Sequence, residues 1–492
     1  MKRKSDLTRR QFIASTIAGS GGILALNNIK GVSQLSDENF IKNKSNRDHT
    51  VIKMVYVAKP VPTWPCPDID IDAEMKMIND NLSNLEKLWD FKERDWDFKV
   101  KFVGGELLRV PEHFPKFKEN IGDVDGIFVF QLTSTMMYMI NNIINLGYPM
   151  VLFNQPASGH DWASMADLIK QGKKVDVISS SDFGELEPYA RIMDAMRRLK
   201  QSKIICIRQR TEKDDGIKKM ENKYGVEIKL MDYSRINQIF NTIDNKEAEK
   251  EAEKFINNAM KVIEPPKEDI ISANKFYLAV KKLLEEEKAN TMTIDCLGGF
   301  NRGDLKAYPC VAWSRLNDEG LTGVCEADLD STLTSIMLKF YAGGKPGFVT
   351  DPFFDTHFNT IVHAHCVSAT KMDGLSGESL PYNIRTHMED NKGVAVQVKM
   401  REGQIVTSTV LKNSDTMLVS TAQIIDNSDK NRGCRTKFNC KIIDPETMEE
   451  ISADKYLHNW TSGLHRVIFY GNLIKDIQKM GRLMEFNVVR EV

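Results

Sequence analysis

The sequence predicts two parallel α/β units followed by a β-rich C-terminal domain, and three observations indicate this fold class. The chain of 492 residues is too long for one core, because a domain typically holds about 150 residues. From residue 52, short apolar runs alternate with amphipathic patterns, as in parallel sheets covered by helices. After about residue 340 short strands with tight turns predominate, which is typical of an antiparallel barrel or sandwich. We place the three domains at residues 51–170, 171–325 and 326–492.

The elements of the first unit follow from apolar runs of strand length and from longer patterns with helical spacing. We expect strands at 52–58, 97–103, 125–132 and 149–155, and helices at 71–89, 113–121 and 133–147.

The second unit repeats this alternation, and the charged residues of its helices are expected on solvated faces. We expect strands at 175–181, 203–209, 226–232 and 291–299, and helices at 186–199, 216–225, 245–263 and 269–288.

The C-terminal domain is marked by apolar strands that are separated by turns of two or three residues. We expect strands at 393–400, 404–412 and 416–425, then a helix at 472–484 and a last strand at 485–492. The stretch 320–340 lies at the boundary, here called the seam, between the α/β region and the β-rich region. Ligand sites often lie at such domain boundaries.

The N-terminus resembles a twin-arginine export signal. Residues 1–30 contain a basic start, the pair Arg9 and Arg10, and an apolar run from Ile13 to Leu26. A membrane anchor is the alternative, although the run is short and rich in Gly and Ser for a spanning helix. Residues 31–50 form a polar linker. We expect a periplasmic or otherwise exported protein without a stable membrane partner.

Charge and cysteine content narrow the function. The 67 Lys and Arg residues balance 68 Asp and Glu residues. The chain therefore lacks the excess of basic residues that would indicate a nucleic-acid partner. The eight cysteines contain no C-x-x-C pair, which argues against a zinc ribbon and against a dense disulfide framework. Cys434 and Cys440 could pair, or both could be free thiols.

Glu326 stands where a glycine-bounded loop leads into a helix. A carboxylate at that point has two interpretations. It could complement the positive end of the helix dipole, worth about 0.3–1 kcal/mol, or it could bind a metal. The local sequence leaves both open.

Further carboxylates follow in the stretch 344–366. Asp351 precedes Pro352, which we expect to end regular pairing and to leave the carboxylate at the end of a strand. Asp355 is a second acidic candidate.

Histidines gather near these acids. Three of the nine histidines, His357, His363 and His365, fall in the same stretch, and His458 and His465 precede the last helix. Strand alternation puts His363 and His365 on one face. A single histidine is typical of a hydrogen-bonded structural residue, but a cluster beside acids favours a metal site. Carboxylates and imidazoles suit Mn²⁺, Mg²⁺, Co²⁺ or Fe²⁺ more than structural zinc.

The chain resembles the L-fucose isomerase and L-arabinose isomerase superfamily. The shared features are two parallel α/β domains, a β-rich domain, acids at the seam and a histidine near the end of the chain. The segment 320–339 resembles the loop and helix start that present the first acidic ligand, which implies that role for Glu326. The segment 343–355 is similar to the one that supplies the second acid, which implies that role for Asp351.

The resemblance also selects histidines. The segment 463–489 resembles the histidine, helix and strand that end the arabinose-type enzymes, and it favours His465 over His458. The segment 361–366 is similar to the one that supplies a further histidine ligand, which falls on His365.

The resemblance implies a homo-oligomeric aldose–ketose isomerase that acts on a small-molecule sugar through an enediol. It implies one divalent cation, with Mn²⁺ as first candidate, held by Glu326, Asp351, His465 and His365. The two carboxylates would also act as base and acid. An exported carbohydrate-binding protein without catalysis and a metal-dependent epimerase of a modified sugar are the alternatives.

Overall fold

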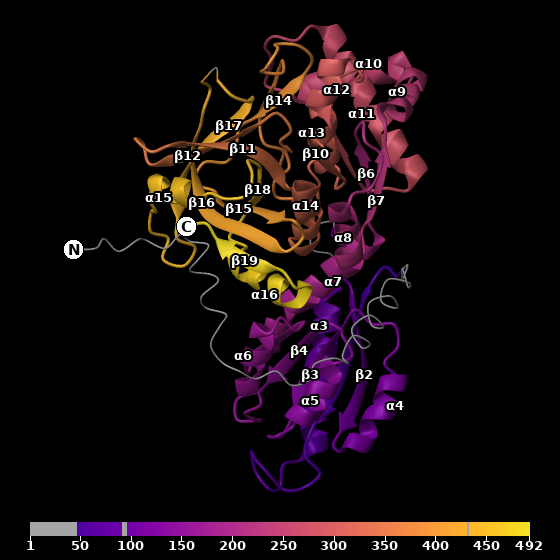
Figure 1. Cartoon of the computed structure of the whole chain (residues 1–492), viewed down its shortest axis with the longest axis vertical. Helices are drawn as coiled ribbons and strands as arrows, with labels where there is room; N and C mark the ends of the chain where they lie inside the picture. The colour runs from indigo at the N-terminus through magenta and orange to yellow at the C-terminus, as the bar shows by residue number, and fades with distance from the viewer. Residues whose placement is uncertain (1–46, 91–95, 431) are drawn as a thin grey trace, which may run out of the picture. The chain divides into compact units, whose positions relative to one another are not determined.

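The computed structural model describes residues 47–90, 96–430 and 432–492, which all belong to one compact unit spanning residues 44–492. Two parallel sheets with helices against them precede an antiparallel barrel (Figure 1). The predicted fold class is therefore confirmed. The predicted export signal at 1–30, with most of the linker, lies outside the described residues. Of the helices in the described ranges, none combines the length and the apolar character that crossing a bilayer requires.

The first sheet has five parallel strands in the order β2-β1-β3-β4-β5. β3 and β4 are buried along their whole length, which explains their continuous apolar sequences. The strands are β1 (Thr50–Val57), β2 (Val100–Leu108), β3 (Gly126–Gln131), β4 (Met150–Asn154) and β5 (Val175–Ser179). The helical elements among them are α3 (Ile71–Trp89), η1 (Pro111–His113), α4 (Phe114–Glu119), α5 (Met137–Ile144) and α6 (Trp162–Lys170).

β5 differs from the sequence-based assignment, which places residues 175–181 in the second unit. The strand pairs in parallel with β4 and completes the first sheet. Strand and helix alternate in the same way on both sides of this point, so the pattern does not mark where the chain leaves one sheet for the next.

The second sheet has four parallel strands in the order β10-β9-β6-β7. The strands are β6 (Lys203–Ile207), β7 (Glu227–Met231), β9 (Thr291–Ile294) and β10 (Thr322–Cys325). The helical elements from β5 onward are η2 (Phe183–Leu186), α7 (Glu187–Gln201), α8 (Asp215–Tyr224), α9 (Tyr233–Thr242), α10 (Asn245–Asn258), α11 (Lys267–Glu287), α12 (Cys296–Arg302), α13 (Cys310–Asp318) and α14 (Leu329–Tyr341).

The strand expected at 291–299 is shorter in the structure. β9 ends at Ile294 because the next residue, Asp295, caps α12 by accepting the N–H of Gly298 at 3.0 Å. β10 lies at one edge of the sheet, and its carboxyl end leads directly to Glu326.

Burial of Lys339 on α14 makes the stability of the fold depend on pH. Its side chain is buried, and the ammonium donates to the Gly320 carbonyl at 2.9 Å and to the Thr322 hydroxyl at 2.5 Å. Burial lowers the pKa of Lys339 from 10.5 to about 7. Between these values the unfolded chain holds a proton that the folded protein has released, so unfolding takes up a proton and stability rises with pH.

We therefore expect the free energy of unfolding of the natural protein to rise between pH 7.5 and 9.5 relative to that of Lys339→Met. The difference is at most about 1.4 kcal/mol per pH unit. Urea unfolding of both proteins across this range measures it, and parallel pH profiles would contradict the expectation.

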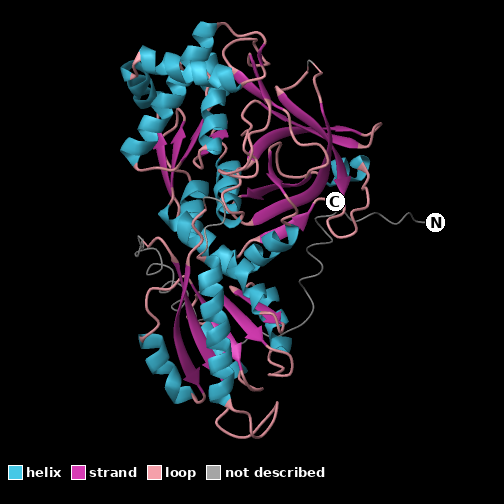
Figure 2. Cartoon of the chain, turned by 180° about the vertical axis from the view of Figure 1, so that it is seen from behind, coloured by secondary structure: helices cyan, strands magenta, loops and turns pink. Residues whose placement is uncertain are grey.

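The C-terminal region contains a closed barrel of six antiparallel strands. The order around the barrel is β15-β18-β11-β12-β17-β16, and β16 pairs back with β15. Closure gives each of these strands a partner on both sides for at least part of its length, and their curvature is visible in Figure 2. β19 (Asn487–Arg490) adds to β16 in parallel. The barrel strands are β11 (Phe348–Asp355), β12 (Thr360–His365), β15 (Ile405–Lys412), β16 (Thr416–Asn427), β17 (Thr436–Ile443) and β18 (Arg466–Tyr470).

The remaining elements connect these parts. A small sheet in the order β14-β13-β8 joins a segment of the second unit to the C-terminal region. These elements are β8 (Lys261–Val262), β13 (Tyr382–Arg385), β14 (Ala395–Val398), α15 (Ala453–Asn459) and α16 (Ile474–Met484).

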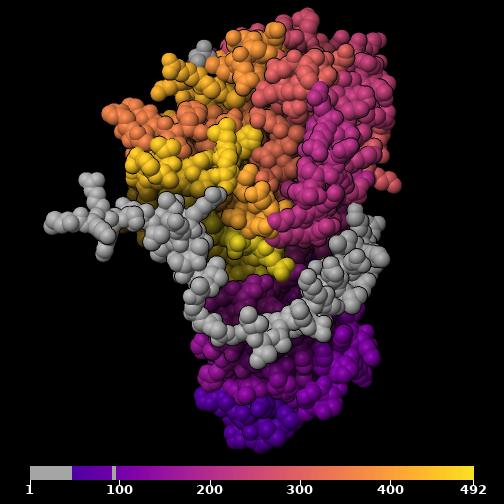
Figure 3. Space-filling model, in the orientation of Figure 1, coloured from indigo at the N-terminus to yellow at the C-terminus, as the bar shows by residue number. Residues whose placement is uncertain are grey.

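The second α/β unit and the barrel share one hydrophobic core. Phe276 and Trp313 from helices of the unit belong to the same buried cluster as Phe438 and Tyr470 from the barrel. Figure 3 shows residues of the two parts adjoining on one face of the molecule. The seam between β10 and the barrel is therefore held by packing, and Glu326 leaves β10 at this seam.

An ion pair lies buried within the barrel domain. Arg466 of β18 and Glu491 have fully buried side chains, and Arg466 Nη2 donates to Glu491 Oε1 at 2.5 Å. The Arg466 guanidinium stacks on the ring of Trp460, 3.8 Å from its centroid. Two charges removed from water are tolerated here because each neutralises the other.

Candidate metal centre

Glu326 lies in a tight turn between β10 and α14. Glu326 and Ala327 both have left-handed backbone conformations, with φ of 64° and 52°. Such angles are uncommon for residues other than Gly. The alternative role of Glu326, complementing the helix dipole, stays a prediction, and Glu326 lies two residues before the helix cap. The helix begins at Leu329, and Asp328 is its cap.

The register of two barrel strands brings Asp351 and His465 together. β11 and β18 pair as far as Thr350 and Arg466, and Asp351 and His465 are the next residues beyond this pair. The prediction that Asp351 ends a strand is wrong, since β11 continues past Pro352 and pairs there with β12. The proline is tolerated because pairing with β18 stops at Thr350, which leaves one edge of β11 free of a ladder partner.

His365 is the last residue of β12. Its ring is buried, and its Nδ1 accepts the backbone N–H of Cys366 at 2.9 Å. His363, two residues earlier, lies 2.9 Å from the Thr350 hydroxyl through Nδ1, and burial lowers its pKa to about 3. His363 is therefore a neutral core residue outside the cluster.

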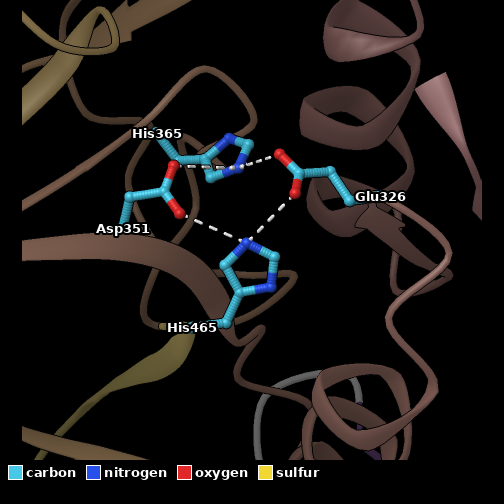
Figure 4. Close-up of side chains that lie close together, drawn as sticks. All are labelled: Glu326, Asp351, His365 and His465. Carbon is cyan, nitrogen blue, oxygen red and sulfur yellow. Dashed lines mark ion pairs between the residues drawn. The ribbon is translucent and has the colours of Figure 1, made fainter. Parts of the chain in front are cut away.

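Four side chains meet at the seam between the second unit and the barrel. One donor atom from each of Glu326, Asp351, His365 and His465 lies within 4.8 Å of the others (Figure 4). His465 Nε2 is 3.4 Å from Glu326 and 3.2 Å from Asp351, and His365 Nε2 is 3.6 Å and 3.7 Å from the same two residues. The structure thus brings together all four residues that the sequence nominated.

Opposite charges stabilise this cluster. The adjacent imidazoles of His365 and His465 hold the pKa of Glu326 well below its usual range. Burial opposes ionisation of His465, yet hydrogen bonds with Asp328, Asp351 and Glu326 raise its pKa to about 12. Burial also opposes ionisation of His365, but Glu326 and Asp351 raise its pKa as well. A positively charged His465 is therefore favoured between the two carboxylates.

The donor set fits a divalent cation. Ligands placed about 2.0–2.3 Å from one ion lie up to about 4–4.6 Å apart, so small side-chain movements would let one ion contact these atoms. Two carboxylates and two imidazoles without sulfur suit Mn²⁺, Fe²⁺, Co²⁺ or Mg²⁺.

The other candidates from the sequence lie elsewhere. Asp355 accepts the N–H of Phe358 at the end of β11. His357 is exposed, and His458 is exposed on α15 beside Asp454. Each of these side chains has a local role or faces solvent.

Sequence reasoning missed Asp328. The carboxylate of Asp328 lies 2.8 Å from His465 Nδ1, and it also accepts the N–H and the hydroxyl of Ser331. The pattern Asp-x-x-Ser predicts a helix cap, and nothing in it indicates the additional contact of Asp328 with His465.

The eight cysteines are free, so Cys434 and Cys440 do not pair. Cys434 instead lies near Cys366, the neighbour of His365. The sulfur atoms of Cys296 and Cys325 lie 3.3 Å apart, and Cys325 immediately precedes Glu326. Thiols therefore pack behind two of the clustered residues without entering the cluster.

Comparison with known proteins gives remote similarity only. No protein-family profile matches the chain. The chain is 21% identical over 220 residues to sulfoquinovose isomerases of Priestia aryabhattai and Priestia megaterium, in alignments that cover 44% of this chain and 47% of each relative. A protein of the same name from Alkalicoccus urumqiensis is 21% identical over 218 residues. The chain thus spans about half the length of the curated relatives it matches. This similarity supports a relationship to the sugar isomerases.

Proposed function

We propose that the protein is a divalent-metal-dependent aldose–ketose isomerase that acts through an enediol. The observation that carries the proposal is the convergence of Glu326, Asp351, His365 and His465 from four separate segments. The names of the remote relatives independently favour a sugar isomerase.

The two carboxylates have the chemistry that isomerisation requires. The reaction moves a proton from one carbon of the sugar to its neighbour. At the same time the carbonyl oxygen becomes a hydroxyl and the hydroxyl oxygen becomes a carbonyl. Glu326 is held ionised by its histidine neighbours, so it can accept the proton of one carbon, and Asp351, when it carries a proton, can donate that proton to the neighbouring carbon. Proton exchange with solvent then returns both groups to their starting states. A bound cation would supply Lewis-acid stabilisation of charge on the sugar oxygens.

The exposure of the four side chains fits the assignment of proton transfer to the two carboxylates. The carboxylates of Glu326 and Asp351 are 31% and 29% exposed, whereas the imidazoles of His365 and His465 are 5% and 13% exposed. Solvent therefore reaches the two acidic side chains more than the two imidazoles, as acids that work on an incoming sugar require.

The test is a sugar panel with controlled metal content. We expect Mn²⁺-loaded protein to interconvert at least one aldose–ketose pair, and we expect chelator-treated protein to lose this activity and regain it with Mn²⁺. The panel should include neutral hexoses and pentoses and a 6-sulfonated hexose. Interconversion is followed by chromatography or by NMR of the sugar carbons. Metal-independent turnover, or tight sugar binding without turnover, would reject the proposal.

The outcome also separates the alternatives. A carbohydrate-binding protein needs no convergent acid and histidine set, and it would bind sugar equally well after chelation. An epimerase would use the same proton chemistry but would return an aldose as product.

We also propose export through the twin-arginine pathway, based on Arg9 and Arg10 and the apolar run that follows them. Replacing both arginines by lysine preserves charge and should trap the protein in the cytoplasm. Cell fractionation with immunodetection measures this. Unchanged export would rule out the signal, and membrane association that survives a salt wash would favour the anchor.

A further inference from the structure

The two imidazoles of the cluster have different hydrogen-bond partners on Nδ1. His465 Nδ1 lies 2.8 Å from the carboxylate of Asp328. An ionised carboxylate only accepts hydrogen bonds, so Nδ1 of His465 carries a proton. In the neutral ring the lone pair is then on Nε2, which is the atom that faces Glu326 and Asp351.

Asp328 is well placed to hold this orientation. It accepts the Ser331 N–H at 3.0 Å and the Ser331 hydroxyl at 2.6 Å while it caps α14. The carboxylate is therefore fixed by the helix, and it fixes His465 in turn. A carboxylate on the far nitrogen of a metal-binding imidazole sets the tautomer and raises the basicity of the ligand.

His365 has the opposite arrangement. Its Nδ1 accepts the backbone N–H of Cys366 at 2.9 Å, and a backbone N–H can only donate. The neutral ring therefore carries its proton on Nε2. This atom is buried without a hydrogen-bond partner in the structure and lies farther from both carboxylates than His465 Nε2 does.

We propose that the two histidines divide the work of the site: His465, positioned by Asp328, is the imidazole ligand of the cation, and His365 donates a hydrogen bond from Nε2 to a substrate oxygen. This proposal rests on the function proposed above. For His365 to bind the cation through Nε2, its proton would have to move to Nδ1, which would then face another donor 2.9 Å away. A neutral imidazole that donates to an oxygen gaining charge is an established means of stabilising an enediolate.

The first test measures Mn²⁺ binding by isothermal titration calorimetry, without any sugar. We expect His465→Asn to weaken binding at least 100-fold and Asp328→Asn to weaken it about 10- to 100-fold. His365→Asn should stay within about threefold of the natural protein. Asp330→Asn is the matched control, because Asp330 lies on the same helix turn but pairs with Lys412 at 2.7 Å. Equal losses in His365→Asn and His465→Asn would overturn the division of roles.

A second measurement needs no functional variant. Long-range ¹⁵N–¹H correlation of the Zn²⁺-loaded natural protein reports which nitrogen of each ring holds a proton, and the two histidine variants assign the signals. We expect His465 with protonated Nδ1 and a metal-bound Nε2, and His365 with protonated Nε2. A metal-bound Nε2 on His365 would overturn the proposal even if His365→Asn fails to fold.

Kinetics separate this proposal from the proposed function. Excess Mn²⁺ should restore kcat in Asp328→Asn, where the ligand is only loosened, but not in His365→Asn. If no sugar is turned over by any form, the isomerase function fails, and the binding and NMR results still decide which histidine holds the cation. If the enzyme is active and both histidines prove to be ligands, only the division of roles fails.

Discussion

Replacing Glu326 by glutamine is expected to lower kcat about 1,000-fold while the fold is retained. Glutamine has nearly the same shape and can remain in the turn between β10 and α14, but its amide cannot accept the proton of the sugar. Its uncharged oxygen is also a weaker partner for a cation and for the histidines that lie 3.4 Å and 3.6 Å away. Steady-state kinetics on the sugar identified by the panel, with circular dichroism as the check on folding, measure the effect.

Glu319→Gln is the matched control for this substitution. Glu319 precedes β10 and pairs with Lys281 at 2.8 Å, so it changes a glutamate close in sequence without touching the cluster. We expect its kcat to remain within about twofold of the natural value. Natural turnover in Glu326→Gln would mean that Glu326 serves only the turn.

Replacing Glu491 by glutamine is expected to lower the free energy of unfolding by about 3–5 kcal/mol. The substitution leaves the Arg466 guanidinium charged and buried, with both of its hydrogen bonds to Glu491 weakened. Arg466 begins β18 and directly follows His465, so the loss also loosens the start of the strand beside the candidate ligand. Urea unfolding monitored by circular dichroism gives the change.

Two comparisons show whether burial causes this loss. Asp80→Asn removes an exposed pair with Lys76 and should cost less than about 1 kcal/mol. The double replacement Arg466→Met with Glu491→Leu removes both charges and should recover much of the stability lost in Glu491→Gln. A loss in Glu491→Gln no larger than that in Asp80→Asn would show that the pair contributes little.

The fold class was predictable because it depends on local periodicity. The strands of the two parallel sheets appear in the sequence as apolar runs, and their helices appear as amphipathic patterns. The membership of β5 and the closure of the barrel were not predictable in the same way. Both depend on which strand pairs with which, as in the contact of β15 with β16 that closes the ring, and pairing is a non-local property.

The composition of the site was predictable and its geometry was not. Acids and histidines that cluster in the sequence favoured a metal site, and the resemblance to the isomerase superfamily selected Glu326, Asp351, His365 and His465 among them. The left-handed turn at Glu326 was hidden because neither Glu326 nor Ala327 is a glycine or an asparagine. Asp328 was hidden for a different reason, since one residue performs two roles and the sequence pattern reveals only the cap.

The contact between Asp328 and His465 joins residues 137 positions apart in the chain. We expect a contact between residues so far apart in the sequence to form late in folding, because the entropy of closing a long loop must be overcome before the contact can stabilise the chain. Partly folded chains in which β18 is not yet docked therefore lack the complete site. A cation that binds only the finished site stabilises the native state selectively, by about 2.7 kcal/mol when its concentration is 100 times its dissociation constant. The supply of metal during folding would then influence how much of the chain reaches the native state.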